Sequence, residues 1–177
     1  MRILNVKDKL FFYMTLEFKI RELSESDKHA VLSIYNYHVI NGFAAYSDKE
    51  LKIEFINRLK KDSISFIILE IENKIVGFAV LRNYLPYENF KHTGQLSYFI
   101  KPEYTNKGFG TILLNKLVKS AIAKGINIFI VHLTSLNEQS LNFHKKHGFI
   151  ECGRLTDIAM KFNRSFDIIF MQKVINS

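Results

Sequence analysis

A loop with two glycines, placed between a predicted strand and a predicted helix, limits most strongly what this chain can fold into. The stretch YTNKGFGTILLNKL, residues 104–117, follows the alternating segment QLSYFIK, residues 95–101, which Pro102 ends. From Gly108 onward the apolar residues keep helical spacing as far as Gly125. A turn of this kind points backbone N–H groups and the positive end of the helix dipole at one place. The sequence therefore predicts an anion-binding loop, and a pyrophosphate suits it.

The residues of this loop suit a phosphate group, but they do not match two common kinds of phosphate-binding loop. Gly108 and Gly110 have no Cβ and let the main chain approach a ligand, while Lys107 adds a positive charge and Thr111 a hydroxyl donor. A nucleoside-triphosphate loop has its lysine after the last glycine, but here the lysine precedes it. A dinucleotide loop has a third glycine where this chain has Leu113. Both of these alternatives fit poorly.

Composition indicates one globular domain over residues 16–177, because 47% of the 177 residues are hydrophobic and 24% are charged. Residues 1–15 are expected to be an N-terminal extension, either disordered or the result of a start codon upstream of Met14. The single cysteine excludes an internal disulfide. The charged start of the chain does not read as a signal peptide, and no stretch approaches 18 uncharged apolar residues. We therefore expect a cytoplasmic protein without a membrane partner.

The chain carries a formal net charge of +8, which suits any polyanionic partner. The lysines are spread along the sequence and form no block of five or six like charges. An anionic cofactor or an ordinary solvated surface explains this charge at least as well as a nucleic acid does. We expect no nucleic-acid partner.

Hydrophobic periodicity predicts the element order βααβββαβαββ. Helices are expected from about 27 to 40, from about 108, and over NEQSLNFHKKH. A further helix is expected after a capping box of Ser47 and Glu50, with an apolar face of Leu51, Phe55, Ile56 and Leu59. The strands are expected at 16–23, in a hairpin over 63–84, at 95–101, at 126–133, and in FIECGRL and SFDIIFMQKVI. This order predicts an α/β (α+β) fold with a mixed, mostly antiparallel central sheet of six to seven strands and helices on both faces.

Two segments resemble motifs of the GCN5-related N-acetyltransferase (GNAT) superfamily. Residues 105–110 are similar to its Gln/Arg-x-x-Gly-x-Gly/Ala loop, with Thr105 in place of Gln or Arg. LTSLNEQSLNFHKKHGF, residues 133–149, is similar to its Asn-x-x-Ser/Ala-x-x-x-Tyr/His-x-x-x-Gly-Phe element. The resemblance implies a GNAT-like acyl-CoA N-acyltransferase fold, acetyl-CoA as co-substrate and a homodimer.

The resemblance also implies a set of residues that hold acetyl-CoA. Asn137 would bind the pantetheine arm, and His144 would lie near the thioester sulfur, where its usual pKa of about 6.5 permits proton exchange near pH 7. Backbone N–H groups around Phe99 and Ile100 would polarise the thioester carbonyl. The predicted cofactor-binding residues are Tyr98, Phe99, Ile100, Asn106, Lys107, Gly108, Phe109, Gly110, Thr111 and Asn137.

Over residues 17–174 the chain resembles the phosphinothricin N-acetyltransferase branch of this superfamily. In YENFKHTGQLSYFI, Tyr87 stands where the branch has Arg, Phe90 where it has Tyr, and Gln95 where it has Glu. An amide cannot accept a proton from an ammonium as a carboxylate does, so the base lies elsewhere or a water chain replaces it. His144 and Gln95 are the predicted catalytic residues. The predicted substrate-binding residues are His38, Tyr46, Arg82, Tyr87, Phe90 and Thr93, with Arg82 replacing the lost Arg.

The predicted function is transfer of an acetyl group from acetyl-CoA to the amine of a small molecule, by direct attack in a ternary complex. The acceptor is for example an amino acid, or an analogue such as phosphinothricin or methionine sulfoximine. The alternatives are a CoA-binding module with lost or altered catalysis and a protein N-terminal acetyltransferase. No metal is expected, because nothing supplies a third ligand beside His144 and His147.

Overall fold

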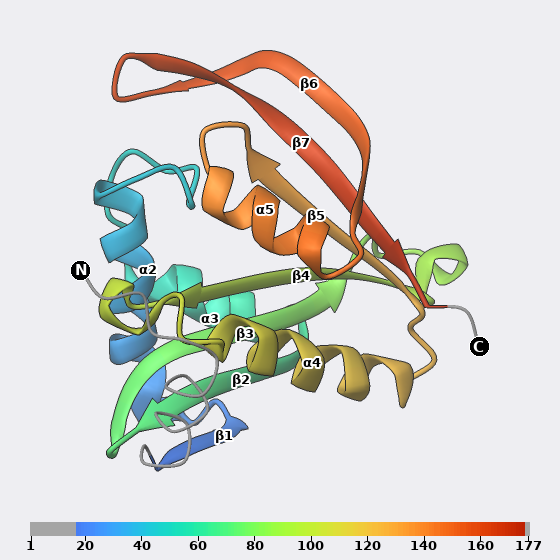
Figure 1. The fold of residues 1–177 in the computed structure, drawn as a ribbon. Helices are drawn as coiled ribbons and strands as arrows, with labels where there is room; N and C mark the ends of the chain where they lie inside the picture. The colour runs from blue at the N-terminus through green and yellow to red at the C-terminus, as the bar shows by residue number, and fades with distance from the viewer. Residues whose placement is uncertain (1–16, 176–177) are drawn as a thin grey trace.

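The computed structural model describes residues 17–175, which form a seven-stranded sheet in the order β1-β2-β3-β4-β5-β7-β6 (Figure 1). The strands are β1 (Phe18–Glu22), β2 (Ser63–Ile71), β3 (Lys74–Asn83), β4 (Thr93–Ile100), β5 (Ile128–Thr134), β6 (Ile150–Lys161) and β7 (Arg164–Val174). β4 and β5 run parallel, and the other neighbouring pairs are antiparallel. The predicted mixed, mostly antiparallel sheet is confirmed. The expected N-terminal extension lies outside the described residues.

Four α-helices cover the sheet, two on each face. They are α2 (Lys28–Ile40), α3 (Ile53–Lys61), α4 (Phe109–Ile122) and α5 (Glu138–Lys146), with 3-10 turns η1 (Glu25–Asp27), η2 (Glu88–Phe90) and η3 (Pro102–Tyr104). Side chains of β2 alternate between the faces: Phe66 and Ile68 belong to the core under α2 and α3, while Ile67 and Leu69 belong to the core under α4. Leu141 of α5 also packs on that second core. The predicted element order and the helices on both faces are confirmed.

The second helix begins later than the capping box of Ser47 and Glu50 predicts. Helix α3 starts at Ile53, and Leu51 stays outside it. The side chain of Asn36 donates to the Leu51 carbonyl oxygen and accepts from the Leu51 N–H, each at 2.9 Å. Because both backbone groups of Leu51 are bound by a residue of α2, this stretch remains extended. The predicted helix start was wrong for this tertiary reason.

The two central strands pair over only part of their length. Thr93–Gln95 of β4 lies opposite Ile128–Ile130 of β5, and no further residue pairs join the two strands within the described chain. Both strands continue, to Ile100 and to Thr134, and Figure 1 shows them diverging. The sheet therefore opens between β4 and β5, beyond Gln95.

Candidate active site

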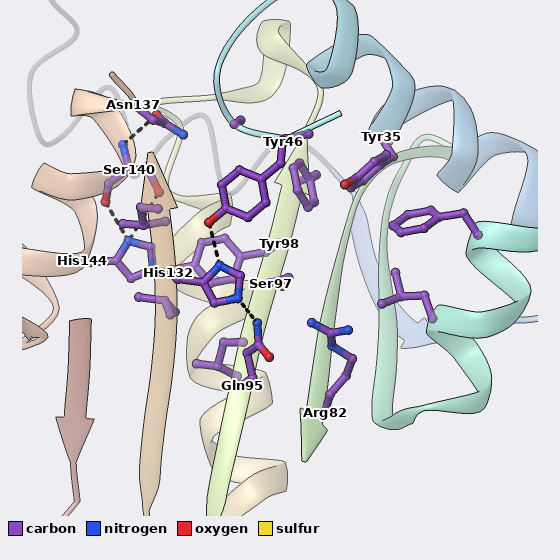
Figure 2. Close-up of a pocket in the computed structure, with 18 residues that line it drawn as sticks. Tyr35, Tyr46, Arg82, Gln95, Ser97, Tyr98, His132, Asn137, Ser140 and His144 are labelled. Carbon is purple, nitrogen blue, oxygen red and sulfur yellow. Dashed lines mark hydrogen bonds between the residues drawn. The ribbon is translucent and has the colours of Figure 1, made fainter. Parts of the chain in front are cut away.

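A pocket lies where β4 and β5 diverge (Figure 2). Its polar lining comes from α2 and the loop after it, from β3, β4 and β5, and from α5 and its N-cap. These residues are Tyr35, Tyr46, Arg82, Gln95, Ser97, Tyr98, His132, Asn137, Ser140 and His144. Phe99 contributes an aromatic wall. The structure thus brings together seven of the predicted site residues: Tyr46, Arg82, Gln95, Tyr98, Phe99, Asn137 and His144.

Four predicted substrate-binding residues do not line this pocket. Tyr87 is 66% exposed, and Phe90 packs against Tyr84 in the segment before β4. Thr93 is buried at the start of β4, where that strand still pairs with β5. His38 lies on α2 with Nε2 at 2.9 Å from the Ile100 carbonyl oxygen. The first three lie toward the paired end of β4, and the pocket opens at its other end.

The glycine loop presents main-chain groups at the start of α4. Gly108 is the N-cap residue with φ +86°, and Asn106 has φ +58°, so both adopt the left-handed conformation. Ile112 donates to the Gly108 carbonyl oxygen and closes the first turn, so the N–H groups of Gly110 and Thr111 within that turn have no intrahelical acceptor. They lie at the positive end of the helix dipole. This main-chain donor set fits a pyrophosphate.

Two loop side chains are turned away from a ligand role. The Phe109 ring is buried in the core beside Phe18, so only its main chain faces the loop. His147 Nδ1 lies 2.8 Å from the Phe143 carbonyl oxygen, and its Nε2 lies 3.0 Å from the Thr111 hydroxyl. In a neutral ring Nδ1 then carries the proton, and the Thr111 hydroxyl donates to Nε2. The Thr111 hydroxyl, which we expected to donate to a phosphate, therefore donates to His147 at the C-terminal end of α5.

Gly110 has a packing role. A Cβ at this position would lie 3.2 Å from the Phe143 ring of α5. The absence of a Cβ therefore lets α4 and α5 approach each other, whereas the sequence suggested that it lets a ligand approach. Lys107 lies at the loop with Nζ 5.4 Å from the centroid of the Tyr104 ring.

The free edge of β4 determines which N–H groups face the opening. Lys101 donates to the Val76 carbonyl oxygen on β3 at 2.8 Å, and N–H directions alternate along a strand. The N–H groups of Tyr98 and Ile100 therefore point away from β3, toward the opening, whereas that of Phe99 points to β3. An extended ligand with amide groups can pair with this edge as a strand would. Of the groups around Phe99 and Ile100 that we expected to polarise a carbonyl, the N–H groups that face the opening are those of Ile100 and Tyr98, whereas Phe99 lines the pocket with its ring.

Asn137 marks the other side of the opening, as the N-cap of α5. Its Oδ1 accepts a hydrogen bond from the Ser140 N–H at 3.2 Å. The side-chain amide group remains able to donate into the pocket.

His144 is buried, with 1% of its surface exposed, and both ring nitrogens are hydrogen-bonded. Nδ1 lies 2.7 Å from the Ser140 carbonyl oxygen, and Nε2 bonds to the Tyr98 hydroxyl. Burial is the main cause that lowers the pKa of His144 to about 4. The ring is therefore neutral at pH 7, which does not favour the proton exchange near neutrality expected from its usual pKa. Burial also raises the pKa of Tyr98 well above its ordinary value.

His132 joins two predicted residues in a second network. Its Nδ1 lies 2.6 Å from the Tyr46 hydroxyl, and its Nε2 bonds to the side-chain amide of Gln95 (Figure 2). Burial, followed by the positive charge of Arg82, lowers the pKa of His132. Our sequence interpretation missed this residue. The available signal was a histidine in the nearly all-apolar stretch INIFIVHL.

The loop that carries Tyr46 is fastened to the C-terminal hairpin. Lys161 of β6 is 2% exposed, and its Nζ donates to the carbonyl oxygens of Gly42 and Ala45, each at 2.8 Å. The Thr134 hydroxyl donates to the Phe43 carbonyl oxygen at 2.8 Å. These bonds place Tyr46 over β5.

Comparison with known proteins identifies the family to which this fold and its pocket belong. The family model described as acetyltransferase (GNAT) family matches residues 31–149, which is more than half of the chain. The chain belongs to the GNAT acetyltransferases.

Relatives of this GNAT protein are named for acetyl transfer. It is 27% identical over 158 residues to an L-methionine sulfoximine/L-methionine sulfone acetyltransferase of Pseudomonas aeruginosa, a match covering 86% of this chain and 92% of that protein. A ribosomal-protein-alanine N-acetyltransferase structure from Brucella melitensis is 30% identical with a TM-score of 0.80, covering 89% and 99% of the two chains. A phosphinothricin acetyltransferase from Sinorhizobium meliloti in complex with acetyl-CoA is 22% identical with a TM-score of 0.82, covering 89% and 88%.

This GNAT protein is accordingly an acyltransferase that uses acetyl-CoA. Within residues 17–175, no three His, Cys, Asp or Glu side chains gather in a way that would hold a metal ion. No helix in this described part of the chain has the length and apolar character needed to cross a membrane.

Proposed function

We propose that this GNAT acetyltransferase acetylates the amine of a small molecule that also carries a carboxylate, as a free amino acid or an amino-acid analogue does. The observation that carries this proposal is the charge of the pocket. Among the described lining residues, Arg82 is the one with a permanent charge, and Asp and Glu are absent. No ion pair of Arg82 is found within the described chain. A guanidinium binds a carboxylate through paired hydrogen bonds, whereas a polyamine would require anionic side chains.

The relatives support the same acceptor class. Methionine sulfoximine and phosphinothricin, which name two of them, are both amino-acid analogues. In our proposal Arg82 holds the acceptor carboxylate near Gln95, which it faces in the β3–β4 register. The acceptor amine then lies in the widening space between β4 and β5.

We assign the acetyl-CoA site to main-chain groups on both sides of the opening. The N–H groups of the loop 106–111 would hold the pyrophosphate, the free edge of β4 at Tyr98 and Ile100 the pantetheine arm, and the Asn137 amide one of its oxygens. Acetyl-CoA supplies the activated acetyl group. In our proposal the Tyr98 hydroxyl, which His144 holds by a hydrogen bond, gives a proton to the leaving sulfur.

A second candidate is N-terminal acetylation of a protein, which the similarity to the ribosomal-protein-alanine enzyme favours. A peptide acceptor has an amide next to its N-terminal residue in place of a carboxylate, so it would leave Arg82 without an anionic partner. Matched acceptors therefore separate the two functions. They are L-methionine sulfoximine, the same amine without its carboxylate, and a peptide with N-terminal alanine.

The test measures kcat and KM for these acceptors at saturating acetyl-CoA, with Arg82→Met as the variant. Methionine keeps much of the apolar stem and removes the charge. We expect turnover of the amino-acid analogue, with a KM about 10 to 100 times higher in Arg82→Met, as loss of a hydrogen bond to a charged group predicts. The decarboxylated amine should be poor with both proteins. A peptide that outperforms every amino acid would overturn the proposal, and binding of acetyl-CoA without any turnover would favour a CoA-binding module.

We also propose that the protein is a homodimer in the cytoplasm. Strand β6 supports an interface because it exposes several large apolar side chains, among them Leu155, Ile158 and Met160. Sedimentation velocity of the wild type and of Ile158→Asp tests the dimer. A monomeric wild type would contradict it.

A further inference from the structure

The pocket lacks a carboxylate that could take the proton of an incoming ammonium. An amine is protonated at neutral pH and has to lose one proton before it can attack a thioester. Among the described lining residues, two histidines have a ring nitrogen that can accept a proton, namely His132 and His144. His144 is buried behind Tyr98, whereas His132 is half-buried on β5 beside the proposed place of the amine. His132 is thus the better placed of the two.

The partners of His132 tolerate a change in its protonation. The Tyr46 hydroxyl at Nδ1 can rotate, so it can either donate or accept. The Gln95 amide at Nε2 can present its NH2 group or, after a flip, its oxygen. The ring can therefore gain and lose a proton while both hydrogen bonds persist. Gln95 stands where the phosphinothricin N-acetyltransferase branch has Glu, and its amide can keep a hydrogen bond to His132 in either charge state of the ring.

We propose that His132 receives the proton of the acceptor ammonium, passed on by the Tyr46 hydroxyl, and that Gln95 orients its ring. The inference rests on the proposed acetylation of an amine. One N–H bond of the ammonium breaks and its proton is held on His132 Nδ1. The freed electron pair forms the C–N bond as the acetyl C–S bond breaks. The leaving thiolate takes the proton of the Tyr98 hydroxyl, the second amine proton restores that hydroxyl, and the proton on His132 leaves to solvent.

Few charged or titratable groups face this ring within the described chain. Arg82 approaches from β3 and Tyr46 from the loop after α2, while Gln95 on β4 and Phe170 on β7 carry no charge. Arg82 and burial both favour the neutral ring, which is the form that can accept a proton. The value of kcat/KM should therefore fall as the pH is lowered and His132 becomes protonated.

The first test compares pH profiles of kcat/KM for the wild type, His132→Gln and a matched control, His29→Gln, on the exposed surface of α2. We expect His132→Gln to lose about 100-fold or more in kcat, as general-base catalysis predicts, together with its acid limb. KM for acetyl-CoA should stay unchanged, and the control should match the wild type. A wild-type rate and acid limb in His132→Gln would overturn the inference.

Tyr46→Phe provides a variant that keeps the ring. It removes the hydroxyl through which the proton passes, and the ring still bonds to Gln95. We expect kcat to fall while acetyl-CoA affinity stays unchanged. An unchanged kcat would remove Tyr46 from the proton path and contradict the proposal as stated.

The second test uses Gln95→Glu and two independent measurements. A carboxylate beside Nε2 should raise the pKa of the His132 ring by about one unit or more, which ring NMR measures without any acceptor. The acid limb of kcat/KM should move upward by the same amount. A ring pKa that moves while the limb stays would sink the inference. If no amine is acetylated by the wild type, the proposed function fails instead, and the NMR titration still reports on the ring.

Discussion

Tyr98 and His144 form a buried pair in which the phenol hydroxyl bonds to Nε2 and the rings stack with centroids 5.5 Å apart at 24°. The Ser140 carbonyl oxygen, 2.7 Å from Nδ1, can only accept a hydrogen bond. In a neutral ring Nδ1 therefore carries the proton, and the phenol donates to Nε2. The histidine orients Tyr98, and the phenol is the group of this pair that can turn toward a leaving sulfur.

Tyr98→Phe should lower kcat about 100-fold, because it removes the proposed proton donor. KM for the acceptor should change little. The variant also leaves buried His144 Nε2 without a donor, which costs about 1 to 3 kcal/mol of unfolding free energy. Steady-state kinetics and urea unfolding check both effects. Tyr37→Phe on exposed α2 is the control, and equal kinetics in the two variants would contradict the role.

His144→Gln should flatten the dependence of stability on acidity. The folded-state pKa of His144, about 4, lies below the unfolded value of about 6.5. Its neutral form therefore contributes stability that is present above pH 6.5 and is lost as the pH falls toward 4. Between pH 7.5 and 4.5 this loss amounts to about 2 to 3 kcal/mol. Urea unfolding at both pH values should show a smaller difference for His144→Gln than for His29→Gln, and equal differences would refute the burial argument.

Lys161→Met should loosen the loop that carries Tyr46. The substitution removes the hydrogen bonds to the Gly42 and Ala45 carbonyl oxygens. We expect a loss of about 2 kcal/mol in unfolding free energy and a fall in kcat, with acetyl-CoA affinity unchanged. Lys119→Met, on the exposed face of α4, loses the same charge and serves as control. Equal behaviour of the two variants in thermal unfolding and kinetics would show that this anchor is dispensable.

Gly108→Ala should weaken acetyl-CoA binding. At φ +86° a Cβ is strained, at a cost of about 1 to 2 kcal/mol. If relief of that strain turns the loop N–H groups aside, the Kd for acetyl-CoA rises about tenfold, which calorimetry measures. Gly153→Ala on β6, where a Cβ would meet open space, is the matched control. Unchanged binding in Gly108→Ala would remove this conformation from the binding argument.

The element order was predictable because the signals are local. The apolar run at 126–133 and the helical spacing after Gly108 each lie within one segment, and both became the expected element. The start of α3 was not predictable in the same way. Asn36 binds both backbone groups of Leu51 from another helix, and no pattern near Ser47 reveals this contact.

The cofactor side and the acceptor side of the candidate site also differ in how well the sequence predicts them, because only the cofactor side depends on a local pattern. The glycine loop is one continuous stretch, so its spacing alone indicated a phosphate cradle. The acceptor side is assembled from separate elements: Tyr46 is held in place by Lys161, more than a hundred residues away, and meets His132 on β5. Tyr87 and Phe90 are near Gln95 in sequence, but they lie outside the pocket lining. The resemblance to the phosphinothricin branch placed Tyr87 and Phe90 at the acceptor, and in the structure they lie toward the paired end of β4.

The short pairing between β4 and β5 leaves two parts of the sheet joined by few backbone hydrogen bonds. One block, β1 to β4, is joined to the other, β5 to β7, through the ladder that ends at Gln95 and Ile130. A cofactor lying in the opening would act as a removable strand that fastens the two blocks together. Each turnover would then break and re-form the contacts through which the cofactor joins the two blocks. The rigidity of the molecule would therefore depend on its saturation with acetyl-CoA.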